Sequence, residues 1–356
     1  MKSLFKPLLL VSIPLVSMTI SGCSALRKMP ASGTSEGTVA VQESDKEPVT
    51  KSSVTIDAVT LLPQVSPAVE AGQYSGITWL GENHYAVVHD KLNGGGIVFF
   101  DIGLSPDSGG IERVTMSIPD ATRLSAVTAM DNEGIAFANG KLYVSAEADQ
   151  SIREYNLDGT PTGLLFQIPE EMQRDRIAGN AGFEALTYNA VTGQFWTTTE
   201  QALPADQDAP RLHRLQCFNA DFTPARQCIY QMDEPLRQAE GTRAYVHGIS
   251  AMAALDDGRL IVLEREVYVP SSIVKALSDS FSFIKLYVVD PTRSTDGILP
   301  KKRLAAFSTT FSTLANYEGM CLGPTLPDGR HTLLLIADSQ GGMSGFTKEY
   351  LKVILF

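Results

Sequence analysis

Polar and acidic residues recur at two fixed places in five similar segments of this sequence. In each segment a polar residue stands before Gly or Ala and a large aliphatic residue, and the apolar run that follows ends on an acid. The first place holds Ser75, Glu133, Glu184, His247 and Glu318, and the second holds Asp90, Glu147, Glu200, Glu264 and Asp338. Carboxylate oxygens are the ligands that Ca²⁺ and Mg²⁺ prefer. If the fold gathers these side chains, they predict a site for a hard divalent cation.

Particular roles follow from this chemistry. A carboxylate or an imidazole can act as a general base, and the candidate catalytic residues are Glu133, Glu184, His247 and Glu318. The candidate metal ligands are Glu133, Glu147, Glu184, Glu200, Glu318 and Asp338, with Ca²⁺ as the expected ion. Arg153 and Arg265 are the candidate substrate-binding residues, because close carboxylates need a neutralising cation. A second interpretation stays open, in which the acids only accept backbone hydrogen bonds in turns and His247 is structural.

The five segments form a repeat, and the repeat indicates which elements position the acids. The small residues stand at positions 76, 134, 185, 248 and 319, and each segment continues into an apolar strand-like run. Two further strand-like runs follow in the first four repeats, whereas the fifth has only EYLKVILF before the chain stops. The missing strand is available earlier as SVTIDAVTLL, residues 53–62. This predicts an all-β fold, a β-propeller with five four-stranded blades closed by pairing of its N- and C-terminal strands.

Two other folds remain open at this point. A repeat longer than about 40–50 residues leaves six blades possible, with one blade too diverged to recognise, and a β-sandwich would not need a period. In a propeller, the innermost strand of each blade runs along the channel and the second strand returns antiparallel beside it. The start of the first strand and the end of the second therefore lie near the same mouth. This geometry would bring both sets of acids together.

Six stretches of the chain resemble a known family. They are YSGITWL, NEGIAFANGKLYVSAE, NAGFEALTYN, GQFWTTTE, GISAMAALDDGRLIVLER and NYEGMCLGPTLPDGRHTLLLIADSQ. Together they resemble the bacterial propeller family described as "esterase-like activity of phytase", over about residues 55–356. Ala185 departs from the family pattern, which has Gly there, and residues 267–282 form a longer segment that could fold as a short helix over one mouth.

The resemblance and the acidic mouth together predict a metal-dependent hydrolase of phosphate esters or related esters, acting on a small anionic substrate. The alternative is a non-catalytic propeller that binds a ligand or an envelope protein at the same mouth. No G-x-S-x-G nucleophile motif, phosphate-binding loop or dinucleotide fingerprint occurs in the sequence. Nucleic acid is excluded as a partner, because 40 acidic against 29 basic residues give a net charge of −11.

The N-terminal residues predict export and attachment to a membrane. Lys2 and Lys6 precede an apolar run from Leu8 to Ile20, which is typical of a signal peptide over residues 1–22. The following Ile20-Ser-Gly-Cys23 resembles the lipobox of bacterial lipoproteins, which implies cleavage before Cys23 and a lipid anchor on it. Ser24 follows Cys23, and a Ser rather than an Asp at this position resembles lipoproteins that Gram-negative bacteria send to the outer membrane. The alternative is an ordinary secretory signal. Residues 23–53 would then be the lipidated Cys and a flexible tether, and residues 54–356 the propeller domain.

Three further cysteines follow Cys23. Cys217 and Cys228 lie in two strand-like runs that flank a turn, so an exported protein would pair them in a disulfide across the hairpin. Cys321 lies in an apolar run and is expected as a buried free thiol. No Cys and His spacing indicates zinc.

Overall fold

The computed structural model describes residues 54–56, 58–70, 72–89, 96–119, 131–177, 179, 181–294, 297–339 and 347–356. The predicted signal peptide, the predicted lipidation site Cys23, the whole predicted tether and Asp90 lie outside the described residues. Within the described part of the chain, no helix has the length and apolar character that a membrane span needs.

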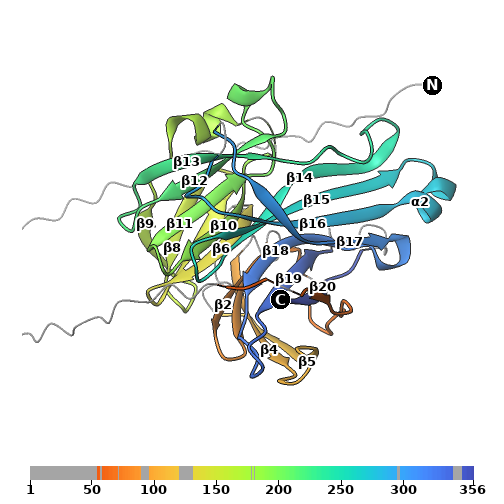
Figure 1. Cartoon of the computed structure of the whole chain (residues 1–356), viewed down its shortest axis with the longest axis horizontal. Helices are drawn as coiled ribbons and strands as arrows, with labels where there is room; N and C mark the ends of the chain where they lie inside the picture. Colours follow the sequence, from red (N-terminus) through yellow and green to blue (C-terminus); the bar gives the residue numbers. More distant parts are fainter. Residues whose placement is uncertain are drawn as a thin grey trace, which may run out of the picture. The chain divides into compact units, whose positions relative to one another are not determined.

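Five four-stranded antiparallel sheets make up the described chain (Figure 1). The first sheet contains β2 (Tyr74–Gly81), β3 (His84–His89), β4 (Gly96–Leu104) and β5 (Ile111–Ser117). The second contains β6 (Asn132–Ala138), β7 (Lys141–Ala146), β8 (Ser151–Tyr155) and β9 (Pro161–Leu165). The third contains β10 (Phe183–Asn189), β11 (Gln194–Thr199), β12 (Leu212–Phe218) and β13 (Pro224–Gln231).

The last two sheets complete a ring. The fourth contains β14 (Thr242–Ala254), β15 (Leu260–Pro270), β16 (Phe281–Val289) and β17 (Lys301–Thr310). The fifth contains β18 (Asn316–Leu322), β19 (Thr332–Asp338), β20 (Tyr350–Leu355) and β1 (Thr60–Leu61). The innermost strands β2, β6, β10, β14 and β18 contact one another in this order, and β18 contacts β2 again. The prediction of a five-bladed propeller is therefore confirmed.

Strand β1 closes the ring as the outermost strand of blade five. Thr60 and Leu61 pair with Leu355 and Ile354, and Val65 exchanges two backbone hydrogen bonds of 2.8 Å with Leu351. The regular strand is shorter than residues 53–62 suggested. The predicted pairing of the two chain ends is confirmed.

Close packing at the axis explains the small residue in each repeat. A Cβ on Gly76 would lie 2.4 Å from the carbonyl oxygen of Glu133, and one on Gly134 would lie 2.5 Å from the backbone nitrogen of Leu186. Adjacent inner strands are thus too close for a larger residue at these positions. The third blade has Ala185 at the same place.

Blade four extends beyond the others on the mouth side. Strand β14 has 13 residues and β15 has 11, and β15 connects to β16 through helix α2 (Ile273–Asp279), which lies at the far end of these strands in Figure 1. Ser272 caps the helix by accepting a hydrogen bond from the Lys275 backbone N–H. The short helix expected within residues 267–282 is therefore present. The described connections contain the 3-10 helices η2 (Glu170–Met172), η3 (Arg174–Arg176), η4 (Pro204–Asp206) and η5 (Phe311–Thr313).

The predicted disulfide between Cys217 and Cys228 is wrong. Both thiols are free, and the register of β12 and β13 pairs Cys217 with Arg226 and Leu215 with Cys228. The two cysteines are diagonal neighbours, which in antiparallel pairs lie about 7–8 Å apart, beyond the usual Cα separation of a disulfide. Cys321 is a buried free thiol, as expected, and burial raises its pKa.

Candidate functional site

A β-bulge in each innermost strand turns one side chain toward the channel. In three inner strands the pairing register shifts around one residue, which is Ser75 in β2, Glu184 in β10 and Glu318 in β18. In β6 the register shifts between Asn132 and Ile135, and Glu133 lies in this interval. A bulge adds a residue to one strand and changes the direction of its side chain, and bulges often occur beside functional sites. A Glu followed by a small residue therefore indicates a β-bulge, and this holds in blades two, three and five.

Blade four follows the same plan three residues later than the sequence repeat suggests. Its bulge lies between Ile249 and Ala251, so Ser250 and not His247 corresponds to the other bulged residues. These five residues, with the small residue after each, line one narrow part of the channel: Ser75, Glu133, Glu184, Ser250 and Glu318. Ile249 pairs with Glu264, so the next residue, Arg265, corresponds to the acids that end the second strand of the other blades.

His247 lies away from the mouth. It pairs with Glu266 across β14 and β15, and its electrostatic neighbours also include Lys285 and Asp233. Burial lowers the pKa of His247, so its imidazole is neutral at pH 7. The prediction that His247 lies among the mouth residues is wrong, because the bulge of blade four lies at Ser250 instead.

A cavity of about 660 Å³ lies at the mouth. Seven of the residues expected there line it: Ser75, Glu133, Glu184, Glu200, Arg265, Glu318 and Asp338. Asp131, Asn316 and Arg243 line it as well. Glu147 lies behind Glu133 and is 2% exposed, and its carboxylate accepts a hydrogen bond from the Gly182 N–H. Residues from all five blades thus contribute to one acidic site.

Arg265 holds two of the carboxylates. Its Nη1 donates to Glu318 Oε1 at 2.5 Å and to Asn316 Oδ1 at 3.0 Å, and its Nη2 donates to Glu200 Oε1 at 2.6 Å. The arginine side chain is 3% exposed. Burial alone would lower the pKa of Arg265, but Glu318, Glu200 and Glu184 raise it, so the guanidinium stays charged. The arginine crosslinks blades three and five through blade four.

The carboxyl group of Glu184 has a strongly raised pKa. Burial raises its pKa well above the ordinary value of 4.5, and the charges of Glu133 and Glu200 raise it further. Burial also raises the pKa of Glu318, although Arg265 opposes this shift. In a site without a bound cation, burial and the neighbouring carboxylates therefore favour the protonated form of Glu184.

Three carboxylates form a group that can hold a metal ion. Asp131, Glu133 and Glu147 offer oxygen atoms that lie within 4.8 Å of one another, and the latter two side chains are buried. This donor set fits a hard cation such as Ca²⁺ or Mg²⁺, which binds oxygen ligands and completes its shell with water or substrate. The carboxylates adjoin the cavity through Asp131 and Glu133.

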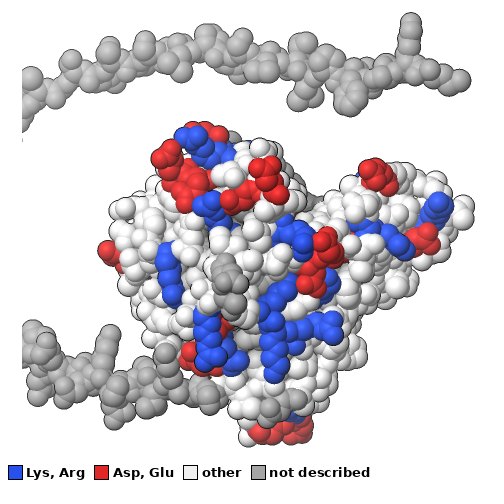
Figure 2. Space-filling view, turned by 45° about the horizontal axis from the view of Figure 1, so that its top comes forward, with Lys and Arg blue, Asp and Glu red and all other residues white. Residues whose placement is uncertain are grey.

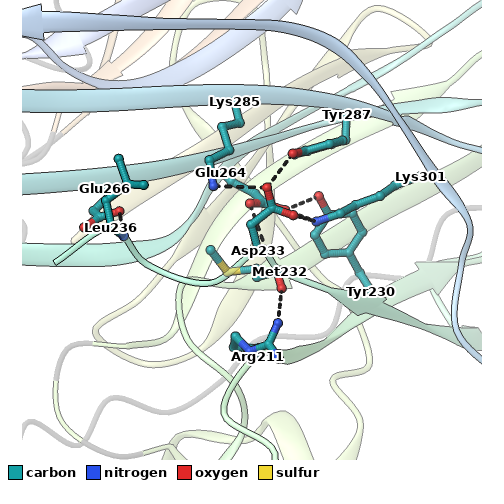
Figure 3. Close-up of polar contacts among 10 residues, drawn as sticks. All are labelled: Arg211, Tyr230, Met232, Asp233, Leu236, Glu264, Glu266, Lys285, Tyr287 and Lys301. Carbon is teal, nitrogen blue, oxygen red and sulfur yellow. Dashed lines mark hydrogen bonds and ion pairs between the residues drawn. The ribbon is translucent and has the colours of Figure 1, made fainter. Parts of the chain in front are cut away.

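Two predicted residues have other surroundings. Arg153 lies on β8 and pairs with the neighbouring Asp149 through its guanidinium, and it does not line the mouth. Glu264, at the end of the apolar run in blade four, accepts hydrogen bonds of 2.6 Å from Tyr230 and Lys301 (Figure 3).

The polar cluster around Glu264 is structural. Figure 3 shows Asp233 between Lys285, Lys301 and Tyr287, with Lys301 Nζ 2.7 Å from Asp233 Oδ1. Burial alone would raise the pKa of Asp233, but these donors lower it. Every group drawn is paired, and the cluster fastens the segment before β14 to blade four.

Two of the mouth residues that were not predicted have a signal in the sequence. Asp131 precedes Glu133 by two positions, and Asn316 precedes Glu318 by two. Residues two apart on a strand share a face, and the Asn316 side-chain N–H₂ indeed donates to Glu318 at 2.7 Å. The pattern Asp/Asn-x-Glu-Gly would have identified both.

Glu184→Gln should stabilise the protein in the presence of a chelator. Between the ordinary pKa of 4.5 and the raised folded value, the unfolded chain releases a proton that the folded chain keeps, so stability falls as pH rises through this window. Gln cannot ionise and avoids this loss. We expect a gain of about 2 °C or more in Tm at pH 7 by calorimetry, with no gain below about pH 4. The exposed control Glu112→Gln should change nothing, and a destabilised Glu184→Gln would contradict the interpretation.

Several solved structures are similar to this chain at low sequence identity. An endo-arabinase from Bacteroides thetaiotaomicron is 11% identical with a TM-score of 0.44, covering 81% of this chain and 95% of its own. An aldose sugar dehydrogenase from Streptomyces coelicolor is 13% identical with a TM-score of 0.43, covering 83% and 98%. An α-L-arabinofuranosidase from Podospora anserina is 12% identical with a TM-score of 0.43, covering 80% and 89%. None of the proteins with curated descriptions matches this chain.

A sequence family matches most of the propeller. The match covers residues 69–340, which include the innermost strands of all five blades, the bulged residues of the channel and Arg265. The chain therefore belongs to the phytase-like family described as "Esterase-like activity of phytase".

Proposed function

We propose that this protein is an exported, lipid-anchored hydrolase that cleaves phosphate esters or related esters in its acidic mouth with the help of Ca²⁺. The observation that carries the proposal is the group of Asp131, Glu133 and Glu147, whose oxygen atoms converge beside a cavity of about 660 Å³. Membership of the phytase-like family supports ester hydrolysis. Anchoring through Cys23 at the outer membrane rests on the N-terminal sequence.

The charge of the mouth explains why a cation is part of the proposal. Six carboxylates line the cavity, against two arginines, Arg243 and Arg265. A phosphate ester would be repelled by this surface. A bound divalent cation would attract the anionic group and lower the pKa of a bound water, which is the chemistry that such ions supply in hydrolases.

The protein's own residues hold and orient the site. Asp131, Glu133 and Glu147 would bind the cation. Arg265 fixes Glu200 and Glu318 by hydrogen bonds of 2.5–2.6 Å, so that neither carboxylate is free to turn into the cavity. Glu184 lies between these two groups and can exchange a proton with a substrate oxygen, because its pKa is raised.

Turnover of p-nitrophenyl phosphate and p-nitrophenyl acetate tests this function. We expect activity to disappear with a chelator and to return with Ca²⁺. Glu133→Gln should raise the Ca²⁺ concentration that gives half-maximal activity by at least about 10-fold, because it removes a ligand. The matched variant Glu112→Gln, exposed on β5, should behave like the wild type.

The alternative is a propeller that binds a ligand or an envelope protein without turnover. In that case Ca²⁺ would still raise Tm by binding only the folded state, and Glu133→Gln would reduce this gain, but no ester would be cleaved. Activity that is unaffected by the chelator and by Glu133→Gln would contradict the metal site itself.

A further inference from the structure

A groove on blade four is lined by basic side chains, although the chain as a whole is acidic. It has a volume of about 410 Å³, and its basic residues are Arg259, Arg293, Lys301, Lys302 and Arg303. We call it the basal groove. Figure 2 shows that Lys and Arg side chains gather near the centre of one face of the protein. A local reversal of charge on a chain of −11 indicates an anionic partner.

The basal groove lies at the opposite end of blade four from the acidic mouth. Arg259 directly precedes β15, whereas the mouth residue Arg265 lies six positions further along the chain, roughly 20 Å along an extended strand. Lys301 to Arg303 begin β17, which runs antiparallel to β16 from the same end. The protein therefore has an acidic end and a basic end.

Only part of the positive charge in the basal groove is neutralised within the fold. Arg259 pairs with Asp257, and Arg293 pairs with Asp290 at 3.1 Å. Lys301 points inward to Glu264 and Asp233 (Figure 3). Lys302 and Arg303 are exposed, and neither has a carboxylate partner among the described residues. Their two charges remain for a ligand.

The N-terminal segment enters the domain at the same place. Ile56 lines the basal groove, Val54 N–H donates to Asp257 at 3.3 Å, and Arg259 donates to the Val54 carbonyl at 2.5 Å. The proposed lipid anchor, Cys23, lies about 30 positions before Val54 in the sequence. An anchor on Cys23 would thus keep this end of the domain near the membrane.

We propose that the basal groove docks onto the phosphate groups of anionic lipid headgroups in the membrane that carries the anchor. Arg and Lys side chains bind phosphate oxygens by charge-assisted hydrogen bonds, and each basic residue near an anionic surface adds about fivefold to binding. The docked domain would point its acidic mouth away from the lipid, toward substrate. This inference goes beyond ester hydrolysis and needs the proposed anchor only for the identity of the membrane.

Vesicle co-sedimentation tests the proposal without the anchor. The protein is residues 23–356 with Cys23→Ser, so that no lipid is attached. The vesicles consist of phosphatidylcholine alone or of phosphatidylcholine with phosphatidylglycerol. We expect binding only to the phosphatidylglycerol vesicles, weakening as salt is added. Lys302→Glu/Arg303→Glu should reduce this binding by at least about 25-fold, that is, fivefold for each lost charge.

The control variant makes the same change of net charge at the other end. Arg237→Glu/Lys275→Glu alters two exposed residues on the mouth side, in the segment before β14 and in α2. It should bind vesicles like the unmodified chain. Equal Tm values for the three proteins would show that each is folded.

Three results would overturn the proposal. Equal loss in both double variants would show that only net charge matters. Equal binding to both kinds of vesicle would exclude an electrostatic surface. Absence of vesicle binding together with a Tm gain in inorganic phosphate, lost in Lys302→Glu/Arg303→Glu, would identify a site for a free phosphate group instead. None of these results bears on ester turnover or on the anchor, which fractionation of cells carrying Cys23→Ser tests separately.

Discussion

Replacing Arg265 with Met is expected to lower the free energy of unfolding by about 3–5 kcal/mol at pH 7. The guanidinium is 3% exposed and donates to Glu200 and Glu318. Met is also long and unbranched, but it leaves both carboxylates buried without their cation. Urea unfolding at pH 7 measures the loss. The loss should shrink at lower pH, because protonation removes the uncompensated charges.

Two controls separate charge from packing in this experiment. Arg153→Met removes an arginine whose partner Asp149 is 42% exposed, and it should cost less than about 1 kcal/mol. Adding Glu200→Gln and Glu318→Gln to Arg265→Met should recover most of the stability, because the triple variant buries no unpaired charge. If Arg265→Met cost as little as Arg153→Met, the arginine network would not stabilise the ring.

Removing residues 54–66 is expected to destabilise the propeller by about 5 kcal/mol and to cause aggregation. The deletion breaks three backbone hydrogen bonds between Leu62 or Val65 and β20, about 1 kcal/mol each. It also exposes apolar surface that Val54 covers, worth about 1.5–3 kcal/mol. The freed edge of β20 can then pair with another molecule. Thermal unfolding and light scattering measure both effects.

The matched control for this deletion begins at Val54 and lacks only the preceding residues. It should keep the stability of the longer chain, because residues 24–53 have no sustained apolar pattern to bury. A chain beginning at Pro67 that remained monomeric and equally stable would show that blade five does not need β1.

The fold could be predicted from the sequence because its repeat has a steric cause. Gly76, Gly134 and Gly319 stand where inner strands approach too closely for a larger residue, so the small residue is visible in the sequence. In blade four the same role falls to Ala251, which stands in an apolar run like any other alanine. Gly248 is small for a different reason: a Cβ there would lie 2.6 Å from the Glu200 carbonyl oxygen. Aligning Gly248 with the glycines of the other blades therefore predicted His247, and not Ser250, as the bulged residue of blade four.

The repeat of the strands predicted which acids meet at the mouth, but it did not predict the contacts that depend on strand register. Glu133, Glu184, Glu200, Glu318 and Asp338 meet at one mouth as the antiparallel return of the second strands requires. The roles of Arg265 and of Cys217 depend on register, which bulges change by one residue at a time and which spacing alone does not define. The convergence of Asp131 with Glu133 and Glu147 depends on side chains from two strands and a turn.

Closure of the ring also has a consequence for biosynthesis. Blade five joins the two ends of the domain, and the Lys352 ammonium donates to the Leu62 carbonyl across 290 positions of sequence. Blades one to four consist of consecutive hairpins and can form as they are synthesised, whereas this last pairing must wait for β20. The six residues of β20 are all buried. A truncation that removes β20 would therefore leave the ring open, because β1 would have no strand to pair with.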